Sequence, residues 1–148
     1  MTKALFGAGC FWGIEEYFRK INGVTDTKVG YSGGITENPS YEDVCYANTD
    51  HVEVVQITYD KKIITFEKLL DHFWKCHDPT QFNRQGFDIG RQYRSAIFYY
   101  SENEKKIALE SKKKKQTFLK KDIATEITKA KNFYLAEDYH QLYIQKRV

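Results

Sequence analysis

The sequence KALFGAGCFWGIEEYF, from Lys3 to Phe18, combines a strand, a glycine turn and the start of a helix. Lys3 to Phe6 is predicted to be a short strand, which the following glycines end. Beyond the turn, apolar side chains recur at the i, i+3, i+4, i+7 spacing of one helix face, namely Ile14, Tyr17, Phe18 and Ile21. Cys10 therefore lies where a strand ends and a helix begins.

Cys10 has the position of a reactive thiol. The first N–H groups of a helix lack an internal partner, and that end of the helix carries partial positive charge. We expect this environment to stabilise a thiolate and to lower the pKa from its usual value of about 8.5. The alternative is a small buried cysteine that only fills the end of the strand. The glycines around it favour the reactive interpretation: Gly7, Gly9 and Gly13.

The same order of strand, glycines and helix also opens dinucleotide-binding folds. Here the spacing is G-x-G-x-x-x-G instead of G-x-G-x-x-G, and bulky Phe11 and Trp12 stand where a pyrophosphate needs open backbone. We therefore expect no cofactor, and no pattern in the chain predicts a metal site. The two rings are either core or the walls of a pocket beside the sulfur. Such a pocket suits a methyl group attached to sulfur.

Strands and helices alternate along the rest of the chain. Further strands are predicted at Val24 to Tyr31, His51 to Tyr59, Arg94 to Tyr100 and Ile123 to Ile127. Helices are predicted at Tyr41 to Ala47, after Thr65, and from Ser101 to about Leu119, with capping boxes at Ser40 and Ser101. Residues 132–148 are expected to form an irregular tail or a short helix.

This order predicts an α+β fold. We expect a single domain over residues 1–148, built as a two-layer sandwich of one mixed β-sheet with helices packed on it. The core is expected to be ferredoxin-like, with long irregular loops.

The segment HDPTQFNRQGFDIGRQY, residues 77–93, fits no periodic pattern. Long structureless loops inside a compact domain are usually functional. Asp88 and Tyr93 lie in this segment, and Tyr41 lies in another irregular region. Polar residues in loops are often functional, but for any one of these residues alone we favour the interpretation that it is part of the polar surface.

Glu53 stands inside the apolar strand HVEVVQITY. A buried carboxylate is costly unless it is paired or protonated, and burial raises its pKa above about 4.3. A carboxyl group that is protonated near neutral pH is suited to general acid catalysis. A salt bridge with a neighbouring Arg or Lys is the alternative, and the sequence leaves the two open.

The composition excludes several classes of protein. The net charge is +3 and the lysine run at residues 112–115 has no interleaved aromatic residue, so no nucleic-acid partner is expected. No apolar run is long enough to span a bilayer and no secretory signal is recognised, so no membrane association is expected. The chain has three cysteines, an odd number, which indicates free thiols in a reducing cytosol and not a set of disulfide bonds. We expect the protein to be a cytoplasmic monomer.

Together these stretches resemble the peptide methionine sulfoxide reductases of the A type. The resemblance covers nearly the whole chain. Its motifs are GCFWG at 9–13, VGYSGG at 29–34, NPSYEDVC at 38–45, HVEVV at 51–55, HDPT at 77–80, RQGFDIGRQYRSAIFY at 84–99 and AEDYHQLY at 136–143.

The resemblance implies a role for each matching residue. Cys10 is the nucleophile, and Glu53 is the acid that protonates the sulfoxide oxygen. Tyr41 and Tyr93 bind that oxygen, and Asp88 belongs to the same pocket. The methyl group of the substrate is held by two aromatic residues, Phe11 and Trp12.

The implied reaction is the thiol-dependent reduction of methionine S-sulfoxide, free or in oxidised proteins, through a sulfenic acid on Cys10. Many family members resolve this sulfenic acid with a C-terminal cysteine, but this sequence has none after Cys76. Cys45 or Cys76 is then the resolving thiol, or an external dithiol such as thioredoxin or glutaredoxin attacks Cys10 directly. We favour the external dithiol. Asp50 also departs from the family, which usually has glycine there.

Two other functions compete with the reductase. The first is a cysteine acyl transferase or hydrolase in which His51 or His140 activates Cys10. It predicts an acyl-enzyme and needs no reductant. The second is a binding module whose aromatic pocket holds a peptide side chain and whose function survives the loss of the thiol.

Overall fold

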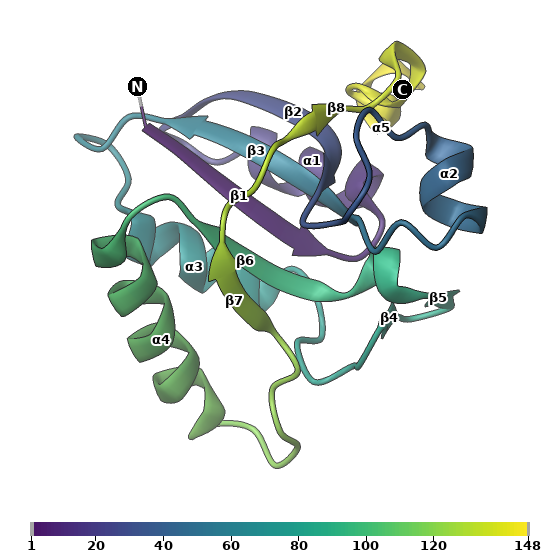
Figure 1. The fold of residues 1–148 in the computed structure, drawn as a ribbon. Coiled ribbons are helices and arrows are strands. Elements are labelled where there is room, and N and C mark those ends of the chain that lie inside the picture. The colour runs from purple at the N-terminus through teal and green to yellow at the C-terminus, as the bar shows by residue number, and fades with distance from the viewer. Residues whose placement is uncertain (1, 148) are drawn as a thin grey trace.

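A six-stranded sheet with the strand order β7-β6-β1-β3-β2-β8 is the framework of the protein (Figure 1). The computed structural model describes residues 2–147, so Met1 and Val148, the ends of the predicted domain, lie outside the described residues. The strands of this sheet are β1 (Thr2–Ala8), β2 (Val24–Ser32), β3 (Val52–Tyr59), β6 (Ser95–Tyr99), β7 (Glu126–Lys129) and β8 (Tyr134–Leu135).

The sheet is mixed, as the sequence predicted. β1 lies in its centre and pairs antiparallel with both β3 and β6, and β2 pairs antiparallel with β3. β6 and β7 run parallel. The α+β class is confirmed, whereas the ferredoxin-like core stays a prediction.

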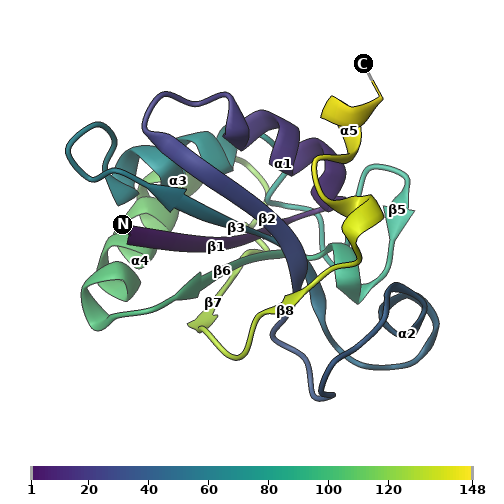
Figure 2. The same ribbon diagram turned by 90° about the horizontal axis from the view of Figure 1, so that it is seen from above.

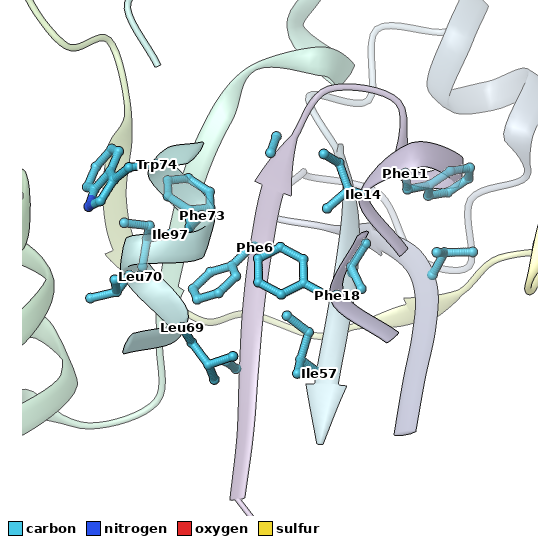
Figure 3. Close-up of a cluster of buried hydrophobic side chains, with 14 of the residues drawn as sticks. Phe6, Phe11, Ile14, Phe18, Ile57, Leu69, Leu70, Phe73, Trp74 and Ile97 are labelled. Carbon is cyan, nitrogen blue, oxygen red and sulfur yellow. The ribbon is translucent and has the colours of Figure 1, made fainter. Parts of the chain in front are cut away.

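Two helices, α1 (Phe11–Arg19) and α3 (Phe66–Lys75), cover one face of the sheet (Figure 2). Their apolar faces meet β1 at Phe6, whose ring centroid lies 5.7 Å from that of Phe18 and 5.0 Å from that of Phe73 (Figure 3). All three rings are fully buried. Each such side chain contributes about 1.5–3 kcal/mol by leaving water, so this cluster anchors α1 and the residues that precede it.

The other face of the sheet is covered by an extended segment of chain. Leu5, Val54 and Phe98 form a second apolar cluster there, against which Ala130 and Phe133 pack. The longest helix, α4 (Glu102–Gln116), lies beside α3, where Trp74 Nε1 donates to Ser111 Oγ at 2.8 Å.

The capping box predicted at Ser40 is confirmed, whereas the box predicted at Ser101 is incomplete, because the Glu104 carboxylate accepts from the backbone N–H of Tyr100 and not from that of Ser101. The Ser40 hydroxyl accepts from the backbone N–H of Asp43, and the Asp43 carboxylate accepts from the backbone N–H of Ser40, which completes the capping box of α2 (Tyr41–Tyr46). The Ser101 hydroxyl accepts from the backbone N–H of Glu104 at the start of α4.

Two segments differ from the predicted elements, whereas the last residues include a short helix, which was one of the two predicted outcomes. The loop after α3 contains a small hairpin of two-residue strands, β4 (Arg84–Gln85) and β5 (Asp88–Ile89), and a 3-10 helix, η1 (Arg91–Tyr93). The last residues form η2 (Asp138–His140) and α5 (Tyr143–Lys146). The strand predicted from Ile123 begins only at Glu126, because the Ile123 and Ala124 N–H groups bond to Gln116 and Pro79.

In the described part of the chain, no helix is both long enough and apolar enough to cross a membrane.

Candidate active site

Cys10 lies at the junction that the sequence predicted. β1 ends at Ala8, Gly9 makes the turn, and Cys10 is the residue immediately before α1. Gly9 has a φ of +96°, and a Cβ atom there would lie 2.9 Å from the Gln85 side chain. Glycine is therefore required both by the left-handed backbone and by the β4–β5 hairpin packed against the turn.

Opposing effects act on the Cys10 thiol. Burial is the largest cause and raises its pKa to about 11, and the charges of Glu53 and Asp88 act in the same direction. The backbone N–H groups of Trp12 and Gly13, at the start of the helix, act in the opposite direction and lower the pKa. The predicted helix effect is present, but the predicted lowered pKa is wrong because burial outweighs it. The resting thiol is protonated at neutral pH.

Glu53 reaches the same helix terminus from β3. Its side chain is 1 % exposed, and its Oε1 atom accepts from the Phe11 backbone N–H at 3.2 Å. Burial raises the pKa of Glu53 to about 8; the Phe11 N–H opposes this shift and the charge of Asp88 adds to it. The predicted salt bridge is absent, since the ion pairs in the described residues do not include Glu53. The carboxyl group is mostly protonated at neutral pH.

Tyr41, Tyr93 and Asp88 converge on this pair from three different elements. Burial raises the pKa of the Tyr93 phenol, and Glu53, Cys45, Asp88 and Cys10 raise it further. These charges act on the Tyr93 phenol, so the groups lie in the same part of the molecule. Asp88 itself is exposed on β5, so it contributes charge at the rim of the cleft.

Burial likewise raises the pKa of the Tyr41 phenol. Both phenols are half-buried and stay protonated, so both are hydrogen-bond donors at any physiological pH. Two neutral O–H donors beside a protonated carboxyl group form a site for an acceptor oxygen that gains negative charge.

Phe11 and Trp12 begin α1, and their rings pack against His140 of the C-terminal segment (residues 134–147); their role in holding a substrate methyl group stays a prediction. Trp12 Nε1 donates to His140 Nδ1 at 2.8 Å, and the Trp12 ring stacks on Tyr143 with centroids 3.7 Å apart. The buried Phe11 ring contacts His140 at a centroid distance of 5.2 Å. Tyr143 was not predicted from the sequence to contact Trp12; the available signal was its place in the AEDYHQLY motif.

Glu137 links the C-terminal segment to two other elements near this site, and it was not predicted from the sequence. Its Oε1 accepts from the Tyr31 hydroxyl and its Oε2 accepts from the Tyr41 backbone N–H, each at 3.0 Å. One carboxylate thereby ties the C-terminal segment to β2 and to the start of α2. The position of the Tyr41 phenol depends on this tie.

Neither histidine of the hydrolase hypothesis is a base for Cys10. His51 Nδ1 accepts from the Gly34 backbone N–H at 3.0 Å, and His51 Nε2 bonds to the Thr36 carbonyl at 2.8 Å. The Nδ1 lone pair of His140 accepts from Trp12, which places the proton of the neutral ring on Nε2. The His140 Nε2 atom is buried without a hydrogen-bond partner among the described residues.

The two remaining cysteines are free thiols in different surroundings. Cys76 donates to the Phe73 carbonyl at 3.3 Å, and burial raises its pKa to about 12. Cys45 is half-buried on α2 next to Tyr41, and its pKa is raised as well, first by burial. No three His, Cys, Asp or Glu side chains in residues 2–147 are grouped to share a metal ion.

The fold and this site define a class of α+β protein in which a thiol stands directly before a helix whose first N–H group bonds to a buried, neutral carboxyl group. The family model of peptide methionine sulfoxide reductase matches residues 2–148. The chain therefore belongs to the peptide methionine sulfoxide reductase family.

Similar proteins come from plants, archaea and yeast. Peptide methionine sulfoxide reductase A4, chloroplastic, from Arabidopsis thaliana is 57% identical over 97% of this chain. Peptide methionine sulfoxide reductase MsrA from Methanosarcina acetivorans is 54% identical over 99% of it. The chain spans 55% of the length of the first relative and 79% of the second.

The solved structures include Mxr1 from Saccharomyces cerevisiae. Its reduced form superposes with a TM-score of 0.94 at 42% identity, covering 98% of this chain and 84% of the yeast chain. Mxr1 in complex with Trx2 superposes with a TM-score of 0.68 at 32% identity, covering 96% of this chain and 84% of the yeast chain.

Proposed function

We propose that the protein reduces methionine S-sulfoxide to methionine with Cys10 as the nucleophile and Glu53 as the general acid. The observation that carries this proposal is the protonated Glu53 carboxyl at the helix terminus that also holds the Cys10 sulfur. Membership of the family supports it, and so do the names of the relatives, which are peptide methionine sulfoxide reductases.

Glu53 and the two phenols act on the sulfoxide oxygen. This oxygen is a poor leaving group until it is protonated, and Glu53 supplies the proton. The hydroxyl groups of Tyr41 and Tyr93 donate to the same oxygen and stabilise the charge that develops on it. Phe11 and Trp12 hold the methyl group, and Asp88 lies at the rim.

Cys10 then attacks the sulfoxide sulfur. An S–S bond forms between Cys10 and the substrate, the S–O bond breaks, and the protonated oxygen leaves as water. A water molecule then attacks the Cys10 sulfur, the S–S bond breaks, methionine leaves, and Cys10 remains as a sulfenic acid. The substrate sulfur is reduced and the Cys10 sulfur is oxidised by two electrons. The thiol proton replaces the proton that Glu53 gave. The resting thiol loses its proton only when the protonated sulfoxide is beside it, so the free protein keeps an unreactive, neutral Cys10.

We propose that an external dithiol of the thioredoxin or glutaredoxin type reduces the sulfenic acid. The first thiol forms a mixed disulfide with Cys10 and releases water, and the second thiol displaces Cys10. The yeast complex of Mxr1 with Trx2 supports this choice.

We also propose that the protein is a monomer of one catalytic domain in a reducing, cytoplasmic environment. Its three free cysteines support the reducing environment.

One assay distinguishes the reductase from its two rivals. A peptide with methionine sulfoxide is incubated with dithiothreitol, and methionine is measured. The wild type turns over, Cys10→Ser does not, and Glu53→Gln loses most of its rate at pH 7. Undiminished turnover by Glu53→Gln would remove the acid role. Ester hydrolysis by the wild type without a reductant would instead support the hydrolase. The binding module would be supported if the wild type did not turn over and Cys10→Ser still bound the sulfoxide peptide.

Recycling is tested with Cys45→Ser, Cys76→Ser and the double variant, with thioredoxin as the reductant. The external-dithiol proposal predicts sustained turnover in all three. Arrest after one turnover in either single variant would identify that cysteine as the resolving thiol.

A further inference from the structure

Asp50 occupies an unusual backbone position just before β3. Its φ is +62°, in the left-handed region that a residue with a side chain rarely adopts. Asp50 is three residues before Glu53. A side chain held at a strained position has a structural or functional reason to be there.

The Asp50 carboxylate contacts both arginines that flank Tyr93. Arg91 Nε donates to Asp50 Oδ1, and Arg94 Nη1 lies 3.7 Å from the same oxygen. Arg94 also donates to the Asp50 backbone carbonyl at 3.1 Å and to the Arg91 carbonyl at 2.9 Å. Tyr93 is the last residue of η1 and lies between these two arginines in sequence.

We propose that Asp50 is a positioning residue, which holds the turn of Tyr93 against the strand of Glu53. The inference rests on the proposed function, in which Tyr93 binds the sulfoxide oxygen and Glu53 protonates it. The two groups come from segments 40 residues apart in sequence, and the Asp50 carboxylate joins those segments beside the cleft. The bond from Arg91 to Asp50 is charge-assisted, and the guanidinium group of Arg94, a residue that is only 4% exposed, lies near the same carboxylate.

Other contacts keep the fold intact when Asp50 is changed. Arg94 Nε still donates to Glu126 Oε1 at 3.2 Å, and its bonds to two backbone carbonyls do not involve the Asp50 carboxylate. Asp50→Gly suits the positive φ and removes the carboxylate. Asp50→Asn also suits it and keeps one acceptor oxygen for Arg91.

The matched control is Asp26→Asn, which removes one carboxylate from an exposed ion pair with Lys28 (3.5 Å). Asp26 pairs with Thr58, at the opposite end of β3 from Glu53. We expect Asp26→Asn to match the wild type in all measurements.

The kinetic experiment measures sulfoxide reduction by Asp50→Gly, Asp50→Asn and Tyr93→Phe. We expect kcat to fall about fivefold or more in Asp50→Gly and by a smaller factor in Asp50→Asn. KM should change less than twofold in both variants. The melting temperature of Asp50→Gly should not be lower than that of the wild type. In the Tyr93→Phe background, Asp50→Gly should cause no further loss, because it acts through the Tyr93 hydroxyl. An equal loss in both backgrounds would overturn the proposal.

A second measurement does not depend on activity. The Tyr93 N–H bonds to the Gly90 carbonyl at 3.0 Å and the Arg94 N–H to the Arg91 carbonyl at 3.2 Å, so hydrogen exchange of residues 90–95 reports on the turn. We expect faster exchange there in Asp50→Gly and unchanged exchange in β1. Unchanged exchange at residues 90–95 would overturn the positioning role. An inactive wild type with faster exchange in Asp50→Gly would overturn the proposed function while leaving the link between the segments.

Discussion

At the scale of single residues, two neutral acids define the chemistry. Glu53 and Cys10 are both protonated at neutral pH, since burial raises the pKa of each above 7. A protonated carboxyl group is ready to donate, and a protonated thiol avoids oxidation when no substrate is bound. The substrate itself therefore completes the active arrangement of charges.

The pH dependence of catalysis follows from Glu53. The active form is the acid, whose pKa is raised to about 8, so this form is lost as the pH rises through that value. We predict that kcat/KM for a sulfoxide peptide falls tenfold per pH unit above about pH 8. In Glu53→Gln the residual rate should lack this fall. A wild-type rate that stays level to pH 9.5 would contradict the assignment.

The sequence predicted the residue identities of the site better than their ionisation. Glu53 was identifiable because a carboxylate among Val52, Val54 and Val55 must be neutral or paired. The Cys10 pKa was not, because the helix contribution is visible in the sequence, whereas the burial that outweighs it arises only from packing.

At the scale of elements, the C-terminal segment shapes the pocket. α5 has only four residues and begins after Leu142, which has a φ of +51°. A helix this short contains no complete apolar period, so the sequence pattern does not predict it. Its place is fixed by contacts distant in sequence, such as the bond from the Leu142 N–H to Glu15 Oε1 at 2.7 Å. α1 and α3 have nine and ten residues and were predictable for the opposite reason. The spacing of their apolar side chains along the sequence shows which helix face is buried.

Tyr143 tests the pocket that this segment completes. We predict that Tyr143→Ala raises KM for a sulfoxide peptide about threefold to tenfold, because Trp12 loses its stacking partner, while kcat changes less. Tyr143→Phe keeps the ring and should retain the wild-type KM. The control is Leu135→Ala, an exposed residue of the same segment. A lower kcat with an unchanged KM in Tyr143→Ala would contradict the pocket role.

At the scale of the whole molecule, the sheet brings the site together at one end. Both ribbon views place α2, the β4–β5 hairpin and α5 at the same end of the molecule (Figures 1 and 2). The strand and helix pattern predicted the sheet, its mixed character and the helix layer. The convergence of residues 41, 88, 93 and 143 depends on loop paths, which hydrophobic periodicity does not encode.

The buried Glu53 also affects the stability of the fold. Its folded pKa of about 8 lies above the ordinary value of 4.5, so its stabilising contribution is complete below about pH 4.5 and is lost as the pH rises through 8. We predict that Glu53→Gln is more stable than the wild type at pH 8.5, by up to about 5 kcal/mol, and equally stable at pH 4. Urea unfolding at both values measures this. The same difference at both pH values would contradict a buried, neutral Glu53.

The most direct measurement is a single turnover without any reductant, in the presence of dimedone. Wild-type protein and methionine S-sulfoxide should give one equivalent of methionine and one dimedone adduct, located on Cys10 by mass spectrometry. Methionine formed by Cys10→Ser, or an adduct on Cys45 or Cys76 in place of Cys10, would contradict the account.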